Sequence, residues 1–237
     1  MARILDIDSP LINFLNKLAD LIYLNFLTLI CCLPIITVGA SMTALHHVLL
    51  KMVRNEEGYM TKTFFKSFKQ NFKQATIIWL IMLVAFFVLI GDFMIFKYSG
   101  LAFPSWLRIV VVGVVLLVLF AVMHVFPVLA RFENTVFNTY KNSLFMGILT
   151  FPKTILMMIC QVIPLLIIIF IPQILPIALV FGISGPAFIS ALLYNNTFKR
   201  FEPQTEEITA DEDWVVEEVE TAEIPETDED ENRWEQE

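Results

Sequence analysis

Long apolar runs alternate with short polar segments along this chain. Five runs are about 20 residues long and almost free of charge, which is the length that a helix needs to cross a hydrocarbon core of about 30 Å. They cover residues 18–38, 77–96, 109–130, 155–171 and 174–194. No charged residue occurs between Thr154 and Phe198, and we expect a tight turn near Pro172 and Gln173 to join two crossings there. The pattern predicts an all-α, polytopic transmembrane helical bundle of about five spans, with amphipathic cytoplasmic helices between them.

Composition excludes a soluble globular domain. Of the 237 residues, 57% are hydrophobic and only 17% are charged, whereas soluble domains have about a quarter of their residues charged. The charge is also unevenly divided, because residues 202–237 contain 17 acids and one base and the remaining residues carry a net charge of +8. We therefore expect residues 1–201 to form the transmembrane domain and residues 202–237 to form an acidic, disordered cytoplasmic tail.

The distribution of lysine and arginine predicts an orientation in the cell membrane. With five spans, 12 of these residues fall on one side and four on the other, so the positive-inside rule places the N-terminus outside and the C-terminus in the cytoplasm. A further crossing within Gly39 to Leu50 would move the predicted N-terminus to the cytoplasmic side. Its short length and the pair His46 and His47 favour a re-entrant or interfacial helix instead.

The segment from Thr61 to Gln74 has the pattern of a helix that lies in the lipid headgroup layer. Its lysines recur at helical spacing beside a row of phenylalanines, and they are Lys62, Lys66, Lys69 and Lys73 beside Phe65, Phe68 and Phe72. Arg131 and Lys141 fall on the same side of the predicted bundle. We expect this side to contact the anionic inner leaflet or a partner protein. Nucleic acid is not an expected partner, because the positive charge lies beside apolar runs and the free tail is negative.

Three polar residues within the spans are the first candidates for a functional site, because ionisable groups are costly in a bilayer. Asp20 and Asp92 are predicted at the same outer depth, either as a polar vestibule or as interfacial partners of Lys17 and Arg108. His124 is predicted near the cytoplasmic end of its span. It is either a proton-coupling residue or a hydrogen-bonded interfacial histidine.

The residues of the common catalytic and metal-binding motifs are not found. The three cysteines are Cys31, Cys32 and Cys160, and the chain has no Cys-x-x-Cys or His-x-x-x-His spacing. It also has no Gly-x-x-x-x-Gly-Lys, Gly-x-Ser-x-Gly or His-Glu-x-x-His sequence. We therefore expect neither a metal, nor a cofactor, nor an enzymatic activity.

Several blocks in order resemble the YesL family of bacterial integral membrane proteins. They are Leu33-Pro-Ile-Ile-Thr-Val-Gly-Ala-Ser-Met-Thr-Ala-Leu45, Lys51-Met-Val-Arg-Asn-Glu-Glu-Gly-Tyr59, Phe64-Phe-Lys-Ser-Phe-Lys-Gln-Asn-Phe72, Phe126-Pro-Val-Leu-Ala-Arg-Phe-Glu133 and Lys141-Asn142. The resemblance covers roughly residues 10–200. It implies a domain with no assigned function, often encoded beside carbohydrate ABC transporters and polysaccharide-utilisation genes, and it offers no catalytic residues.

Two functional hypotheses follow. The first is a non-enzymatic membrane accessory protein associated with carbohydrate uptake or utilisation, which contacts ABC transporter components or a second copy of itself through the blocks near residues 37–45, 64–72 and 126–141. The alternative is a small-molecule transporter or channel that uses Asp20, Asp92 and His124.

Overall fold

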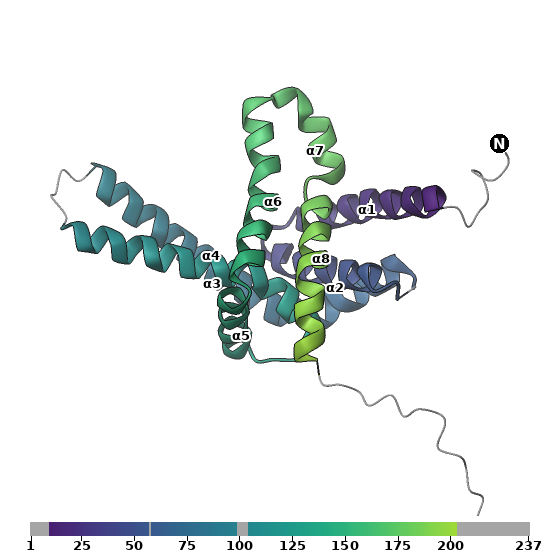
Figure 1. The fold of residues 1–237 in the computed structure, drawn as a ribbon, viewed down its shortest axis with the longest axis horizontal. Helices are drawn as coiled ribbons and strands as arrows, with labels where there is room; N and C mark the ends of the chain where they lie inside the picture. The colour runs from purple at the N-terminus through teal and green to yellow at the C-terminus, as the bar shows by residue number, and fades with distance from the viewer. Residues whose placement is uncertain (1–9, 57, 99–103, 203–237) are drawn as a thin grey trace, which may run out of the picture. The chain divides into compact units, whose positions relative to one another are not determined.

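The computed structural model describes residues 10–56, 58–98 and 104–202, and every regular element among them is helical (Figure 1). The α-helices are α1 (Pro10–Cys32), α2 (Val38–Val53), α3 (Met60–Tyr98), α4 (Ser105–Arg131), α5 (Val136–Leu149), α6 (Phe151–Phe170), α7 (Leu175–Phe181) and α8 (Ser184–Phe201). Two 3-10 helices, η1 (Ile35–Thr37) and η2 (Pro172–Ile174), form connections. The all-α prediction is confirmed.

The boundary of the folded unit falls one residue later than predicted. The chain divides into a unit that ends at Glu202 and a second that begins at Pro203, so Glu202 belongs with the helices and not with the tail. The predicted disorder of the tail lies outside the described residues.

Five described helices are long and apolar enough to cross a membrane, or six if one bent pair counts as a single span. They are Leu11–Cys32, Ile35–Val53, Met60–Tyr98, Trp106–Arg131 and Phe151–Phe170, and the bent pair is Pro172–Phe181 with Ser184–Phe201. The multi-pass prediction is thus confirmed, but the set of helices differs. The segment Gly39 to Leu50, expected as a short re-entrant or interfacial helix, is part of a helix that meets the length and hydropathy of a span.

The helices pair as antiparallel hairpins. Lys17 near the start of α1 hydrogen-bonds to Asn55 just after α2, while Thr37 just before α2 hydrogen-bonds to Cys31 at the end of α1. The α6–α8 pair has its turn at η2 and joins its other ends through Lys153 and Thr197. Figure 1 shows α3 and α4 extending side by side toward the left. The rings of Trp79 in α3 and Phe126 in α4 contact each other.

Helix α2 lies at the centre of the packing. In its span 61% of the residues are buried, against 6% in the most apolar stretch of α3, because α2 contacts α1, α3, α4 and α8. Leu45 and Leu49 of α2 are fully buried beside Tyr194 and Phe198 of α8. The outer faces of the other helices stay exposed and apolar, as at Ile109, which suits contact with lipid acyl chains.

The block around Gly39 is a packing motif. A Cβ atom at Gly39 would lie 2.4 Å from the carbonyl oxygen of Ala75 and 2.8 Å from Cβ of Trp79, so α2 and α3 approach as closely as they do only because the side chain is a hydrogen atom. The Trp79 indole donates a hydrogen bond of 2.8 Å to the Ile35 carbonyl. These contacts give Leu33–Leu45 a structural role.

Candidate functional site: a charged cleft and the basic side

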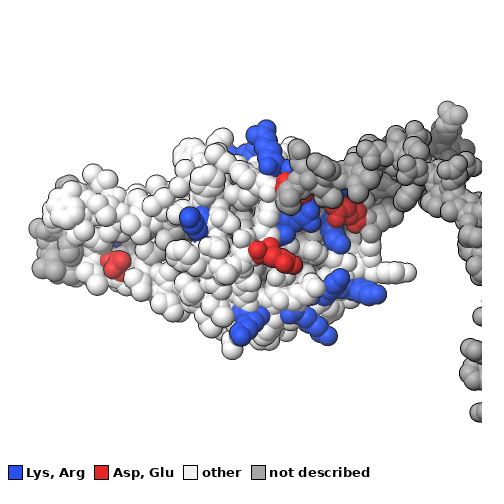
Figure 2. Space-filling model, turned by 90° about the horizontal axis from the view of Figure 1, so that it is seen from below, with Lys and Arg blue, Asp and Glu red and all other residues white. Residues whose placement is uncertain are grey.

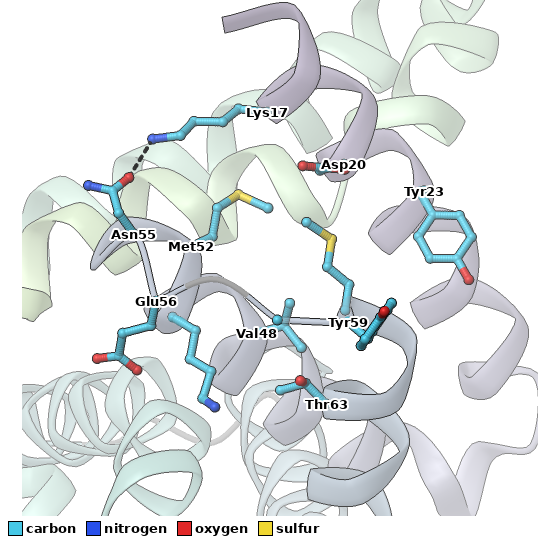
Figure 3. A pocket seen from close by; sticks show the side chains of 12 residues that line it. Lys17, Asp20, Tyr23, Val48, Met52, Asn55, Glu56, Tyr59 and Thr63 are labelled. Atoms are coloured by element: carbon cyan, nitrogen blue, oxygen red, sulfur yellow. Dashed lines mark hydrogen bonds between the residues drawn. The ribbon is translucent and has the colours of Figure 1, made fainter. Parts of the chain in front are cut away.

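A cleft of about 780 Å³ lies between α1 and the corner that joins α2 to α3, where Asn55, Glu56, Gly58 and Tyr59 line it (Figure 3). Two hydrogen bonds connect its walls. The Lys17 Nζ donates to Asn55 Oδ1 at 3.0 Å, and the hydroxyls of Tyr23 and Thr61 share a bond of 2.7 Å. Asn55 has a φ of 53°, in the left-handed region that asparagine tolerates better than most residues. The turn thus brings the start of α3 alongside α1.

The cleft contains charges of both signs. Its lining includes Asp20 and Lys17 from α1, Lys51 from α2 and Glu56 from the corner. Figure 3 shows Asp20 and Glu56 on opposite sides of the opening, with Val48 and Met52 of α2 along one wall. The Asp20 side chain is half-buried and makes no hydrogen bond or ion pair with any described residue. A built cavity therefore contains an unpaired carboxylate.

A second charged cluster joins three helices at their ends. Glu202, just after α8, accepts two hydrogen bonds from Arg54, the shorter at 2.6 Å, and two from Arg131, the shorter at 2.8 Å. The Arg54 Nε also donates to Asn195 Oδ1 at 2.9 Å. Burial alone raises the pKa of the Glu202 carboxyl, but hydrogen bonds from both arginines and their charges outweigh burial and lower it to about 2.

The predicted lysine row is exposed, but only part of the phenylalanine row is. All four lysines and Phe65 and Phe72 lie on the surface of α3. Phe68 is half-buried and lies between Phe64 and Phe72, at ring distances of 6.3 and 5.5 Å. Phe64, outside the predicted row, is fully buried. One side of this helix therefore packs on α2 and the core, and the exposed lysines remain available for an external contact.

The structure does not bring Asp20 and Asp92 together. Asp20 lines the cleft beside Met60, and Asp92 follows Met60 by 32 residues of the continuous helix α3, which is roughly 48 Å at 1.5 Å per residue. The hypothesis of a shared outer vestibule is therefore wrong. Asp20 instead lies in one cleft with Lys51 and Glu56. In the five-span prediction, Lys51 is one of the 12 basic residues on the side opposite to Asp20. The five-span prediction counts α1 as a crossing without α2, whereas the chain folds the two helices into one hairpin.

His124 is enclosed within the bundle. It is buried in α4, with its Nδ1 atom 3.3 Å from the Phe120 carbonyl. His46 and His47 of α2 contact the Tyr194 hydroxyl and the Ala130 carbonyl at 3.2 and 2.9 Å. The two α2 histidines thus have protein partners. Among the described residues no group of three or more His, Cys, Asp or Glu could hold a metal ion.

A buried asparagine caps the break between α7 and α8. Helices α7 and α8 meet at 54°. The Asn25 Nδ2 donates to the Leu179 carbonyl at 2.7 Å, and its Oδ1 accepts from the backbone N–H groups of Ile183 and Ser184 at 3.1 and 2.9 Å. The backbone groups that the break frees are therefore satisfied by one side chain. The sequence signal for this role was an asparagine inside an apolar run. The sequence did not predict its partner Leu179, which is 154 residues further along the chain.

Comparison with known proteins gives a family. Residues 21–93 match the model of a family described as a protein of unknown function, DUF624. The matched segment is less than half of the chain. The resemblance to the YesL family is confirmed, because the YesL family is a DUF624 family. No curated protein and no solved structure matches the chain. The DUF624 segment begins in the middle of α1 and includes α2 and most of α3, so it contains most of the cleft and the close contact at Gly39.

Proposed function

We propose that this DUF624 protein is a non-enzymatic membrane accessory protein that binds its partners on the cytoplasmic side. The observation that carries the proposal is the separation of charge along the hairpins. The connections at residues 33–37 and 171–174 contain no charged residue, and only Lys97 and Arg108 flank the connection at 99–103. The other 14 of the 16 lysines and arginines lie toward the opposite ends of the hairpins or in the terminal segments. We call that side the basic side.

Pairing of the helices bears on the orientation. An antiparallel hairpin crosses a membrane twice or not at all, so α1–α2, α3–α4 and α6 with α7–α8 together contribute an even number of crossings. Both termini then lie on the same side. With 14 basic residues against two, the positive-inside rule assigns that side to the cytoplasm. This proposal replaces the expectation of an external N-terminus, which relied on α1 crossing without α2.

The surface of the basic side suits an acidic or anionic partner. On the face shown in Figure 2, most of the visible lysine and arginine side chains lie away from the end formed by α3 and α4. Each lysine beside an anionic leaflet contributes about 1 kcal/mol to attraction. Exposed Phe65 and Phe72 on the same helix add aromatic area of the kind that anchors protein interfaces. An association with carbohydrate uptake rests on the family resemblance, and membrane subunits of an ABC transporter are the partner class that we propose.

Site-specific photo-crosslinking in native membranes tests this function. A photoreactive residue at position 66, an exposed lysine of α3, should form discrete adducts with a transporter subunit. The same residue at Val112, which is 59% exposed on the apolar face of α4, should not. Replacing Lys62 and Lys69 with glutamate should remove the adducts, and the control Lys97→Glu should keep them. Failure to capture a transport protein at position 66, or adducts that ignore the charge reversal, would reject the proposal.

A small-molecule transporter is the second candidate, and the broken helix favours it. Discontinuous spans form the binding sites of many transporters, and the α7–α8 break lies against Asn25 among buried polar groups. Purified protein in sealed liposomes should then move a solute faster than protein-free liposomes do. Because Asn25 satisfies the freed backbone groups, we rank this function below partner binding.

A further inference from the structure

The unpaired carboxylate of Asp20 needs a partner that the chain does not supply. It lies within a helix apolar enough to span a membrane, and its side chain is half-buried with no partner among the described residues. A charged group in such a position is costly unless it is paired, which makes it a candidate for ligand binding. Lys17, the basic residue on the same helix as Asp20, donates a hydrogen bond to Asn55 instead.

The rest of the cleft complements a small molecule with two opposite charges. Lys51 contributes an ammonium group with no hydrogen-bond or ion-pair partner among the described residues, and Glu56 contributes a second carboxylate at the exposed rim. With Lys17 the formal charges sum to zero, so the cleft has no strong preference for a simple anion or a simple cation. Two tyrosines, Tyr23 and Tyr59, are also among the lining residues, and aromatic rings attract a nearby cation.

The apolar part of the cleft fits a ligand at a membrane surface. Val48, Met52 and Met60 line it, and the volume of about 780 Å³ is typical of ligand pockets. Along α1, Phe14 and Phe26 are 62% and 45% exposed, which extends an apolar surface on both sides of Asp20 in the sequence. A molecule with a zwitterionic head and an apolar body would match both the polar cleft and this surface.

We propose that the cleft binds a zwitterion made of a primary ammonium group and a phosphate, the chemistry of phosphoethanolamine. The ammonium group donates hydrogen bonds to Asp20, and the phosphate contacts Lys51. The source is either the headgroup of a phosphatidylethanolamine lipid or a free phosphoethanolamine. The proposed ligand site is distinct from the partner contact, because the exposed Lys62 and Lys66 of α3 are not among the residues that line the cleft.

Native mass spectrometry of the full chain in detergent tests the lipid source. At equal lipid concentration, phosphatidylethanolamine adducts should exceed those of phosphatidylcholine and phosphatidylglycerol at least tenfold. The choline headgroup keeps both charges but has no N–H to donate, and phosphatidylglycerol has no cation. Asp20→Asn should remove the preference, and so should Glu56→Gln to a smaller extent. Glu56 is exposed, so its replacement should leave the folded core intact. Asp92→Asn, outside the cleft, is the matched control.

Thermal unfolding with soluble O-phosphoethanolamine tests the free source. A rise in melting temperature that Asp20→Asn and Lys51→Gln abolish would identify a soluble ligand, because a ligand that binds only the folded state stabilises it. A lipid preference without this rise would identify the headgroup. Either result supports the proposal. Equal binding of the ethanolamine and choline lipids together with no melting shift, or effects that Asp20→Asn leaves unchanged, would overturn it.

Discussion

Glu202 shows how single residues hold the ends of the helices together. Its carboxylate binds the guanidinium groups of Arg54 and Arg131, which follow α2 and end α4, and it is itself attached to α8. Glu202 was predicted to belong to the acidic tail, because the composition of the chain changes at that point. Composition identifies a charge-rich segment, but it does not show that the first acid of this segment forms ion pairs with the helices.

Loss of this carboxylate should change how stability depends on pH. The folded pKa of Glu202, about 2, is below its ordinary value of 4.5, so the stabilisation is present above about pH 5 and is lost as pH falls toward 2. At pH 7, Glu202→Gln should lower the free energy of unfolding by about 1–2 kcal/mol at this partly exposed site. Melting temperatures in detergent from pH 7 to pH 3 measure the effect.

The two curves should converge as the pH falls, because the wild-type carboxyl also becomes neutral in acid. The exposed carboxylate of Glu133 has no hydrogen-bond or ion-pair partner among the described residues, so Glu133→Gln is the control. A constant difference between Glu202→Gln and wild type at all pH values would contradict the assigned ion pairs.

Asn25 gives a second prediction at this scale. Asn25→Leu leaves the Leu179 carbonyl and the N–H groups of Ile183 and Ser184 without their partner. Each buried group left unsatisfied costs about 1–3 kcal/mol, so we expect a loss of at least about 2 kcal/mol in thermal or denaturant unfolding. Asn138→Leu on the exposed surface of α5 should change stability little. Equal stability of the two variants would show that the break does not depend on Asn25.

Residue types predicted only part of the candidate site. Asp20 was identified because it interrupts an apolar run, and the helical spacing of the α3 lysines predicted that they share one face. Lys51 and Glu56, which line the cleft with Asp20, were not identified from the sequence. Their proximity to Asp20 depends on which side of α1 the α2–α3 corner packs. Spacing along the chain determines the face of one helix, whereas a cleft between helices depends on their pairing.

At the scale of elements, the close contact of α2 and α3 is the main feature that the apolar pattern did not predict. The pattern located the apolar parts of α3, α4 and α6 to within a few residues, because long uncharged runs have few alternatives in a membrane. The segment Gly39 to Leu50 was expected to be a re-entrant or interfacial helix, because it is short for a span and contains His46 and His47. In the structure these histidines have partners on α8 and α4. Tertiary contacts satisfy polar groups that would be costly beside lipid.

Glycine-to-alanine substitutions at two positions distinguish the effect of this close contact on stability from the effect of helix propensity. At Gly39 a Cβ atom would meet the Ala75 backbone at 2.4 Å, whereas at Gly113 in α4 nothing lies within 4 Å. Gly39→Ala should therefore destabilise the protein by about 1–3 kcal/mol. Gly113→Ala should be neutral or stabilise by up to about 1 kcal/mol, because alanine favours a helix. Thermal unfolding of the two variants in detergent measures both effects, and an equal response would contradict the close approach of α2 and α3.

At the scale of the whole molecule, hairpin pairing determines which charged groups share a side. The orientation with an external N-terminus divided the basic residues 12 to four, and pairing α1 with α2 divides them 14 to two. The stronger division favours termini on the cytoplasmic side. In the proposed orientation, the partner contact and the cleft are accessible from the same compartment, and Lys97 near the end of α3 faces the other.

Cysteine labelling tests this arrangement most directly. In a variant whose three native cysteines are replaced by alanine, a single cysteine is placed at position 2 or at position 99, and intact cells are treated with a membrane-impermeant thiol reagent. The account predicts that the cysteine at position 99 reacts in intact cells and that the one at position 2 reacts only after the membrane is permeabilised. Reaction of both cysteines in intact cells would mean that α1 crosses the membrane without α2, and it would contradict the paired-hairpin account.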